Sequence, residues 1–335
     1  MNSPEKPNPD RAVLIKIDER HHDQRLDNFL AAVCKGVPKT HIFRIIRSGE
    51  VRINKKRAEA KTRVYAGDEV RIPPIETSNN QKVEKNTSEE EFNKRQASQA
   101  GQSIPVLFED DGLLVVNKPS GLAVHGGSGQ SHGLIECLRA LRANTHVDLE
   151  LVHRIDRETS GVLVVSKKRS MLRRLQEQLR QRSWKKFYLA LVKGAWPSNL
   201  HQVDLPLLKT QASEKEARVF VSAEGDHALT KFKIIQRFRS SSGDFTLIQA
   251  NILTGRTHQI RVHTSASGFP IVGDDRYGDF ELNKIVAKLG LKRMFLHAAR
   301  LGLIHPATNE PIVLEAPLAP ELERFLHSLQ AIPKS

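Results

Sequence analysis

The segment LVHRIDRETSGVLVVSKK (residues 151–168) places a polar loop between two apolar runs. This pattern predicts two strands joined by a loop that ends at Gly161. Loops held between rigid strands carry a disproportionate share of catalytic groups. Asp156 lies between Arg154 and Arg157, so its carboxylate is expected to stay ionised and to act as a nucleophile or an electrostatic stabiliser. Taken alone, the segment also fits an ordinary turn with surface ion pairs.

Further strand-like runs surround this segment from residue 104 onward. They are IPVLFEDDGLLVVNKP, KFYLALVKG, KFKIIQRF, FTLIQANIL and HQIRVHTS. Helical stretches are expected at about 132–142, 170–182, 281–290 and 319–330. Strands and helices do not alternate regularly, which argues against a doubly wound parallel sheet. We therefore predict an α+β domain over residues 104–335, with a mixed, mostly antiparallel β-sheet and flanking helices.

A second polar cluster lies in LTGRTHQIRVHTSASGFPIVGDDRYG (residues 253–278). Read as a strand, it would point Arg261 towards a site while Ile260 and Val262 pack in the core. A buried arginine needs a carboxylate partner, and Asp156 is the candidate that we expect.

Histidines and glycines near these clusters do not form a known cofactor motif. His258 and His263 lack the i, i+4 spacing of a helical zinc site, and no acid lies between them, so no metal site is expected. The run HGGSGQSHG (125–133) lacks the Gly-Lys-Ser/Thr ending of a phosphate-binding loop. It is interpreted as a flexible loop that touches an RNA backbone.

The N-terminal part of the chain has a different organisation. Residues 1–11 are polar and contain three prolines, which predicts a disordered tail. Residues 12–74 are expected to form a small domain with two helices, in RLDNFLAAVC and after Pro38, followed by short strands. In the second helix, Ile42 and Phe43 are expected on the apolar side with Ile45 and Ile46. Residues 75–103 are predicted to be a flexible linker, because they contain too few apolar groups to offset the entropy of ordering.

Half of the formal charge of +14 lies in one part of this small domain, residues 35–71. Residues 35–71 contain eleven Lys and Arg but four Asp and Glu, a balance of +7. Such a cluster is typical of a surface that binds phosphates without reading sequence, although a merely solvated face would also carry it. The expected RNA-backbone contacts are Arg44, Arg47, Arg52, Lys55, Lys56 and Arg57.

Two cysteines, Cys34 and Cys137, are too few for a disulfide framework or a cysteine-rich zinc site. No signal peptide and no membrane-spanning run is evident. We therefore expect a cytoplasmic protein.

Two resemblances then specify the function. Residues 25–73 resemble the small RNA-binding module named after ribosomal protein S4. The motif HRIDRETSG, with NKPSGLAVH before it and GRTHQIRVH after it, resembles the pseudouridine synthases that act on ribosomal RNA and carry an HRLD-type motif. The resemblance covers the chain from residue 25 to about residue 329. Ile155 departs from the usual leucine, a swap that should not disturb the chemistry.

The resemblance implies roles for individual residues. Asp156 would be the nucleophile, Arg261 its basic partner, and Tyr188 the residue that stacks on the base and is a candidate proton acceptor, through water. Leu296 would line the uracil pocket, and Arg154 would fill the space that a flipped base leaves. The remaining expected substrate-binding residues are Asn117, Lys118, His125, Arg256 and His258.

The implied reaction is isomerisation of uridine to pseudouridine at several sites in 23S ribosomal RNA, without a cofactor. The partner would be this RNA or a large-subunit assembly intermediate, and the protein is expected to be a monomer away from membranes. Two other readings remain open: a non-enzymatic ribosome-assembly factor that uses residues 12–74, and a metal-dependent nuclease that uses the histidines.

Overall fold

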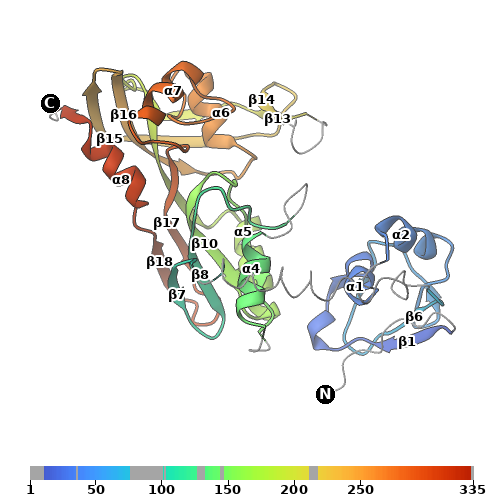
Figure 1. The fold of residues 1–335 in the computed structure, drawn as a ribbon. Coiled ribbons are helices and arrows are strands. Elements are labelled where there is room, and N and C mark those ends of the chain that lie inside the picture. Colours follow the sequence, from blue (N-terminus) through green and yellow to red (C-terminus); the bar gives the residue numbers. More distant parts are fainter. Residues whose placement is uncertain are drawn as a thin grey trace, which may run out of the picture. The chain divides into compact units, whose positions relative to one another are not determined.

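The computed structural model describes residues 11–34, 37–75, 101, 103–126, 133–143, 147–210 and 218–332. The chain divides into two compact units, Met1–Asn93 and Lys94–Ser335, and each is considered by itself (Figure 1). The predicted tail (1–11) and linker (75–103) fall almost wholly outside the described residues and stay predictions.

The N-terminal unit consists of a four-stranded antiparallel sheet and two helices. The sheet order is β1 (Val13–Lys16), β6 (Glu69–Ile72), β3 (Arg52–Ile53) and β4 (Lys56–Arg57). Two short strands, β2 (Gln24–Arg25) and β5 (Arg63–Val64), pair separately. The helices are α1 (Leu26–Val33) and α2 (Lys39–Arg47), as the spacing predicts.

Helix α1 buries its apolar face at Leu26, Phe29 and Leu30, which recur at helical spacing. Helix α2 contributes Ile42, Ile45 and Ile46 to the same core. The expectation for Phe43 was wrong, because its side chain is 42% exposed. Position 43 lies about 100° around the helix from Ile42, which turns it out of the apolar stripe.

The C-terminal unit is built on an 11-stranded sheet. The path is β12 (Gln202–Asp204), β15 (Leu229–Ser240), β16 (Gly243–Ile252), β11 (Lys185–Lys193), β17 (Leu296–Ile304), β10 (Ser160–Ser166), β8 (Leu113–Lys118) and β7 (Val106–Glu109). Strands β9 (Glu150–Leu151), β18 (Pro311–Glu315) and β19 (Gln330–Ile332) pair alongside, and β13 (Leu207–Lys209) with β14 (Val219–Val221) form a separate hairpin. Only β10 and β17 pair in parallel among the registers of this sheet in the described residues. The predicted α+β class with a mixed, mostly antiparallel sheet is confirmed.

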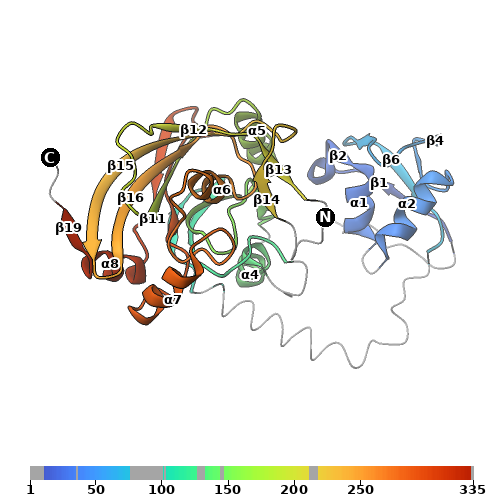
Figure 2. The same cartoon turned by 90° about the horizontal axis from the view of Figure 1, so that it is seen from above.

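Helices cover both faces of this sheet (Figures 1 and 2). Strand β10 shows how: Val162 and Val164 pack with α5 (Arg169–Arg180), whereas Leu163 and Val165 pack with α4 (Leu134–Leu141). Alternate side chains of a strand point to opposite faces, so a strand with a continuous apolar run is buried on both faces of the sheet. At the β11–β16 end, α7 (Phe280–Lys288) and α8 (Pro320–His327) cover one face and α6 (Gln259–Ala266) the other.

Helix α6 corrects one expectation, because HQIRVHTS was predicted to be a strand. Ile260 and Val262 are buried as expected, but they pack in different clusters, against the main sheet and under the β13–β14 hairpin. The helix is buried from Gln259 to Thr264, on all sides. A helix that is enclosed on all sides needs no apolar stripe, so its sequence lacks the 3.6-residue apolar period. The short alternation of apolar and polar residues then resembles that of a strand.

Within the described part of the chain, no helix combines the length and the apolar composition that crossing a bilayer requires.

Candidate active site

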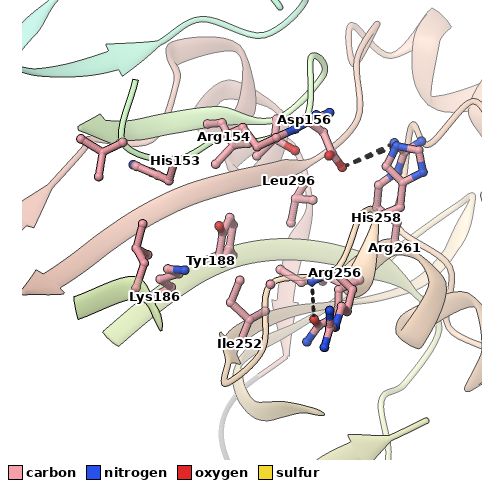
Figure 3. A pocket seen from close by; sticks show the side chains of 17 residues that line it. His153, Arg154, Asp156, Lys186, Tyr188, Ile252, Arg256, His258, Arg261 and Leu296 are labelled. Atoms are coloured by element: carbon pink, nitrogen blue, oxygen red, sulfur yellow. Dashed lines mark hydrogen bonds and ion pairs between the residues drawn. The ribbon is translucent and has the colours of Figure 1, made fainter. Parts of the chain in front are cut away.

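A cavity of about 260 Å³ opens between the 152–159 loop, strand β11 and the segment from Ile252 to Arg261 (Figure 3). It brings together residues that lie far apart in sequence, among them Asp156, Tyr188 and Leu296. Its volume is just below the range of about 300–1,000 Å³ that is usual for drug-sized ligands, so it suits a single base rather than a larger molecule.

Hydrogen bonds hold the loop that carries Asp156. The backbone N–H of Val164 donates to Nε2 of His153 over 3.0 Å, and the N–H of Thr159 donates to the carbonyl of Asp156 over 3.1 Å. The loop ends at Gly161, whose φ is +114°. A Cβ there would lie 2.2 Å from the carbonyl oxygen of Ala298, so only glycine fits against β17. The loop is therefore fixed at both ends, with the carboxylate between them.

The guanidinium of Arg261 lies near three carboxylates, those of Asp274, Asp275 and Asp156. It donates to both oxygens of Asp274 over 2.7 Å each, and its Nη1 lies 3.7 Å from Oδ2 of Asp156. Asp274 is fully buried, whereas the side chain of Asp156 is 21% exposed at the cavity wall. Burial opposes ionisation of Arg261, but the hydrogen bonds and charge of Asp274 outweigh it and raise the pKa of the guanidinium. The expected pair with Asp156 is thus present at longer range, while Asp274 is the main partner.

His258 approaches Asp156 from the other side. Its Nε2 lies 4.0 Å from Oδ2 of Asp156, and its Nδ1 lies 2.9 Å from the hydroxyl of Tyr277. The backbone N–H of Val219 donates to the same hydroxyl over 3.0 Å, which leaves the phenol proton for His258. The proton of the neutral imidazole therefore belongs on Nε2, facing the carboxylate. Burial lowers the pKa of His258, which keeps it neutral at neutral pH.

Tyr188 and Leu296 form the apolar wall of the cavity (Figure 3). Tyr188 packs against two hydrophobic clusters of the core. Burial, and then the charge of Asp156, raise the pKa of its phenol. The phenol therefore keeps its proton at neutral pH, which suits stacking and hydrogen bonding better than direct removal of a proton.

The other predicted substrate residues divide into two groups. Arg154 and Arg256 line the cavity, as His258 does. Asn117, Lys118 and His125 are not among the residues that line it. Their role in substrate binding stays a prediction.

Lys118 has a different environment from the one expected. Its side chain is fully buried, and its ammonium donates to the carbonyls of Pro119, Leu122 and Arg157 over 2.7–2.9 Å. Burial lowers its pKa to about 7. Lys118 joins the turn after β8 to the loop that carries Asp156, so it acts on the position of the loop.

The predicted phosphate-binding residues lie on the N-terminal unit. All six side chains, Arg44, Arg47, Arg52, Lys55, Lys56 and Arg57, are exposed. Asn54 and Lys55 have φ values of +49° and +68°, which gives the β3–β4 hairpin the two left-handed residues of a type I′ turn. Arg57 also donates to the carbonyl of Arg47 over 2.6 Å, which ties the hairpin to the end of α2.

Sequence reasoning missed Asp274, Tyr277 and Lys186. The first two lie in GDDRYG, soon after Arg261, and the need of a buried arginine for a carboxylate could have pointed to the acids there. Lys186 carried one signal, its even spacing from Tyr188 on a predicted strand, which puts both side chains on one face.

Comparison with known proteins agrees with this geometry. The RNA pseudouridylate synthase family matches residues 112–266, and the S4 domain family matches residues 24–70. The chain is 49% identical to the ribosomal large subunit pseudouridine synthase C of Vibrio vulnificus over 320 residues, 96% of this chain and 97% of that one. It is also 49% identical to the enzyme of the same name from Escherichia coli K12 over 322 residues, with the same coverage.

A solved structure supports the fold. Human RNA pseudouridylate synthase domain containing 4 superposes with a TM-score of 0.57 and 27% identity, over 73% of this chain and 100% of that one. By its conserved domains, its identity to these relatives and the cavity around Asp156, this chain belongs to the pseudouridine synthase family.

Proposed function

We propose that this protein isomerises uridines of large-subunit (23S) ribosomal RNA to pseudouridine in the cavity that contains Asp156. The observation that carries the proposal is the position of this carboxylate. It is partly exposed at the wall of a base-sized cavity, 3.7 Å from the guanidinium of Arg261. The two bacterial relatives described above are named as synthases of the ribosomal large subunit.

The chemistry explains why such a site suffices. The reaction breaks the bond between ribose carbon 1′ and ring nitrogen 1 and forms a bond to ring carbon 5. It transfers no electrons and no group to a second substrate, so neither a redox cofactor nor ATP enters the balance. It needs a carboxylate beside the nucleoside, a pocket that retains the free uracil while it rotates, and an acceptor for the proton of carbon 5.

The described residues can meet these needs. Asp156 would act as the nucleophile, with Arg261 and the Nε2–H of His258 holding its charge and orientation. Tyr188 and Leu296 would enclose the uracil. Because a stacked base cannot rotate, a uridine in a helix must leave the stack, and the exposed Arg154 at the rim could fill the gap.

RNA binding would begin at the N-terminal unit, whose six exposed cations match a phosphate backbone better than a base edge. The substrate would be this RNA, free or in an assembly intermediate. We further propose that the protein acts as a monomer in the cytoplasm.

The test is to incubate the full chain with an unmodified 23S transcript whose uridines carry tritium at carbon 5, in the presence of EDTA. Tritium release reports loss of the carbon-5 proton directly. We expect release by the wild type, none by Asp156→Asn, and unchanged RNA affinity in that variant. Glu158→Gln is the matched control, because this carboxylate pairs with Arg157 over 2.7 Å and is not among the cavity-lining residues.

Three results would contradict the proposal. Tritium release by Asp156→Asn would remove the assigned nucleophile. RNA binding without release by the wild type would favour an assembly factor, and strand cleavage on adding a divalent metal would favour a nuclease.

A further inference from the structure

A second cavity of about 270 Å³ adjoins the one that contains Asp156. The two share wall residues, among them Lys186, Ile252 and Arg256. The residues that line the second cavity include three cations, Arg182, Lys186 and Arg256, and no acid. We call it the cationic cavity.

Lys186 is the central feature of the cationic cavity. It lies on β11, two residues before Tyr188 and on the same face, so it borders both cavities (Figure 3). Its side chain is half-buried, and burial lowers the pKa of its ammonium. The ammonium lies 5.7 Å from the centre of the Trp184 ring, which supplies a cation–π contact in place of a carboxylate.

Lys186 makes no ion pair and no hydrogen bond through its ammonium with any residue that the structure describes. A partly buried charge without a carboxylate partner carries a desolvation cost, so proteins retain such groups where a ligand supplies the opposite charge. The missing anion would therefore come from outside the chain.

The two arginines add positive charge to the same cavity. Arg256 is fixed by Asp226 over 3.1 Å and by the carbonyl of His227. Arg182 is exposed, and its φ of +54° is unusual for a residue with a side chain. Three cations around a single hollow, two half-buried and one exposed, match a group whose charge is spread over several oxygens.

We infer that the cationic cavity binds a backbone phosphate of the RNA strand next to the uridine that enters the Asp156 cavity. This rests on the proposed function for the choice of RNA as the source of the phosphate. The shared wall makes the two sites adjacent, so the phosphate contact would fix the register of the strand while the base enters. Lys186 is then a binding residue for the substrate backbone.

The test couples a protein change to a single linkage in the RNA. A stem–loop of large-subunit rRNA is chosen for tight binding to the full chain, and an uncharged methylphosphonate is placed at each loop linkage in turn. Affinity is measured in phosphate-free buffer for the wild type and for Lys186→Gln. Lys185→Gln is the matched control, because this neighbouring lysine points to the opposite face of β11 and lines neither cavity.

We expect Lys186→Gln to weaken binding by about tenfold, the scale of one charge-assisted contact. At one linkage the methylphosphonate should weaken wild-type binding about as much, and cause no further loss in Lys186→Gln. Lys186→Arg should keep the wild-type pattern, which separates loss of charge from loss of folding. Lys185→Gln should leave the effect of every linkage intact.

The inference is overturned if the losses caused by Lys186→Gln and by the methylphosphonate add at every linkage. Tritium release by the wild type on the same stem–loop reports separately on the proposed function. Coupling without release would leave the phosphate site standing and remove the isomerase, whereas release without coupling would do the reverse.

Discussion

The hydroxyl of Tyr277 lies 2.9 Å from Nδ1 of His258, so the other ring nitrogen, Nε2, faces the carboxylate of Asp156 at 4.0 Å. The phenol accepts from the backbone N–H of Val219 and can give its own proton only to Nδ1. His258 is held in the left-handed region, with a φ of +55°, at the start of α6. A strained residue that points a fixed N–H at Asp156 is typical of a functional site. We regard His258 as a positioning residue for Asp156.

Tyr277→Phe should lower the turnover of bound RNA by about tenfold to a hundredfold while leaving RNA affinity unchanged, because it removes the group that fixes the imidazole. In the wild type, activity should fall at acid pH, below the ordinary histidine pKa of about 6.5, because His258 then takes up a second proton. Burial lowers the pKa of His258, so this loss is displaced to acid. In Tyr277→Phe, Nδ1 is free to accept a proton, and the acid limb should move to higher pH. The pH profile of single-turnover rates measures both effects, with Tyr65→Phe as the control in the other unit. An acid limb that stays in place would contradict this role.

Asp274→Asn and Asp275→Asn should differ sharply, although the two acids are neighbours in sequence. Asp274 is fully buried and binds Arg261 through two hydrogen bonds, whereas Asp275 is 75% exposed and lies 3.5 Å from the same guanidinium. Breaking a buried pair costs about 3–5 kcal/mol, and an exposed pair about 0–1 kcal/mol. Denaturant unfolding followed by tryptophan fluorescence checks this, and equal losses in the two variants would contradict the assignment of Asp274 as the main partner.

The same residues show how far sequence reasoning reaches. Helices α1, α2, α4, α5, α7 and α8 and the main strands were predictable, because each has a regular apolar pattern along the chain. Helix α6 was not predictable in this way, because it is buried on all sides and has no polar face to mark its period. Its polar side chains find partners on other segments: His263 bonds Thr230 through Nδ1 and the carbonyl of Leu205 through Nε2.

Which residues of the site pair with one another was harder to predict than which residues belong to it. Asp156 and Arg261 were expected together and do approach each other, but the hydrogen bonds of the guanidinium go to Asp274. Spacing in sequence carries no information on which of several acids reaches a buried arginine, because the answer depends on the turn between α6 and residue 274. The cationic cavity was not predictable for the same reason. Arg182 and Arg256 are far apart in sequence, and only the fold brings them to one cavity.

Neutralising Lys55 and Lys56 together should weaken RNA binding and flatten its salt dependence. Each phosphate contact contributes about 0.7–0.9 to the slope of log affinity against log salt, so the double glutamine variant should lower the slope by roughly 1.5. Arg57 is left in place because it bonds the carbonyl of Arg47 and its loss would disturb the hairpin. The control is Lys284→Gln with Lys288→Gln on α7, which removes the same charge from two exposed positions of the other unit. If both double variants change the slope equally, the hairpin has no specific role.

His153 should make the C-terminal unit sensitive to acid. Its Nε2 accepts from the N–H of Val164 and its ring lies edge-on to Trp184 at 5.2 Å, so the half-buried imidazole must stay neutral. Burial, and then the charge of Lys186, lower its pKa to about 3. The unfolded chain takes up this proton near pH 6.5, so the stability should fall as the pH drops from about 6.5 towards 3, by roughly 1.4 kcal/mol per pH unit. Stability due to the neutral form is thus fully present above pH 6.5 and is lost on the acid side.

Urea unfolding at a series of pH values measures this loss, and both tryptophans, Trp184 and Trp196, lie in the C-terminal unit, so their fluorescence reports on that unit alone. His153→Gln keeps an acceptor for Val164 without a titrating ring and should flatten the pH dependence by about one histidine. His327→Gln, at an exposed position of α8, should leave it unchanged. Residual sensitivity is expected from His297, whose pKa burial lowers to about 4. Full acid sensitivity in His153→Gln would show that the proton is taken up elsewhere, because the glutamine variant has no group at this position that can bind it.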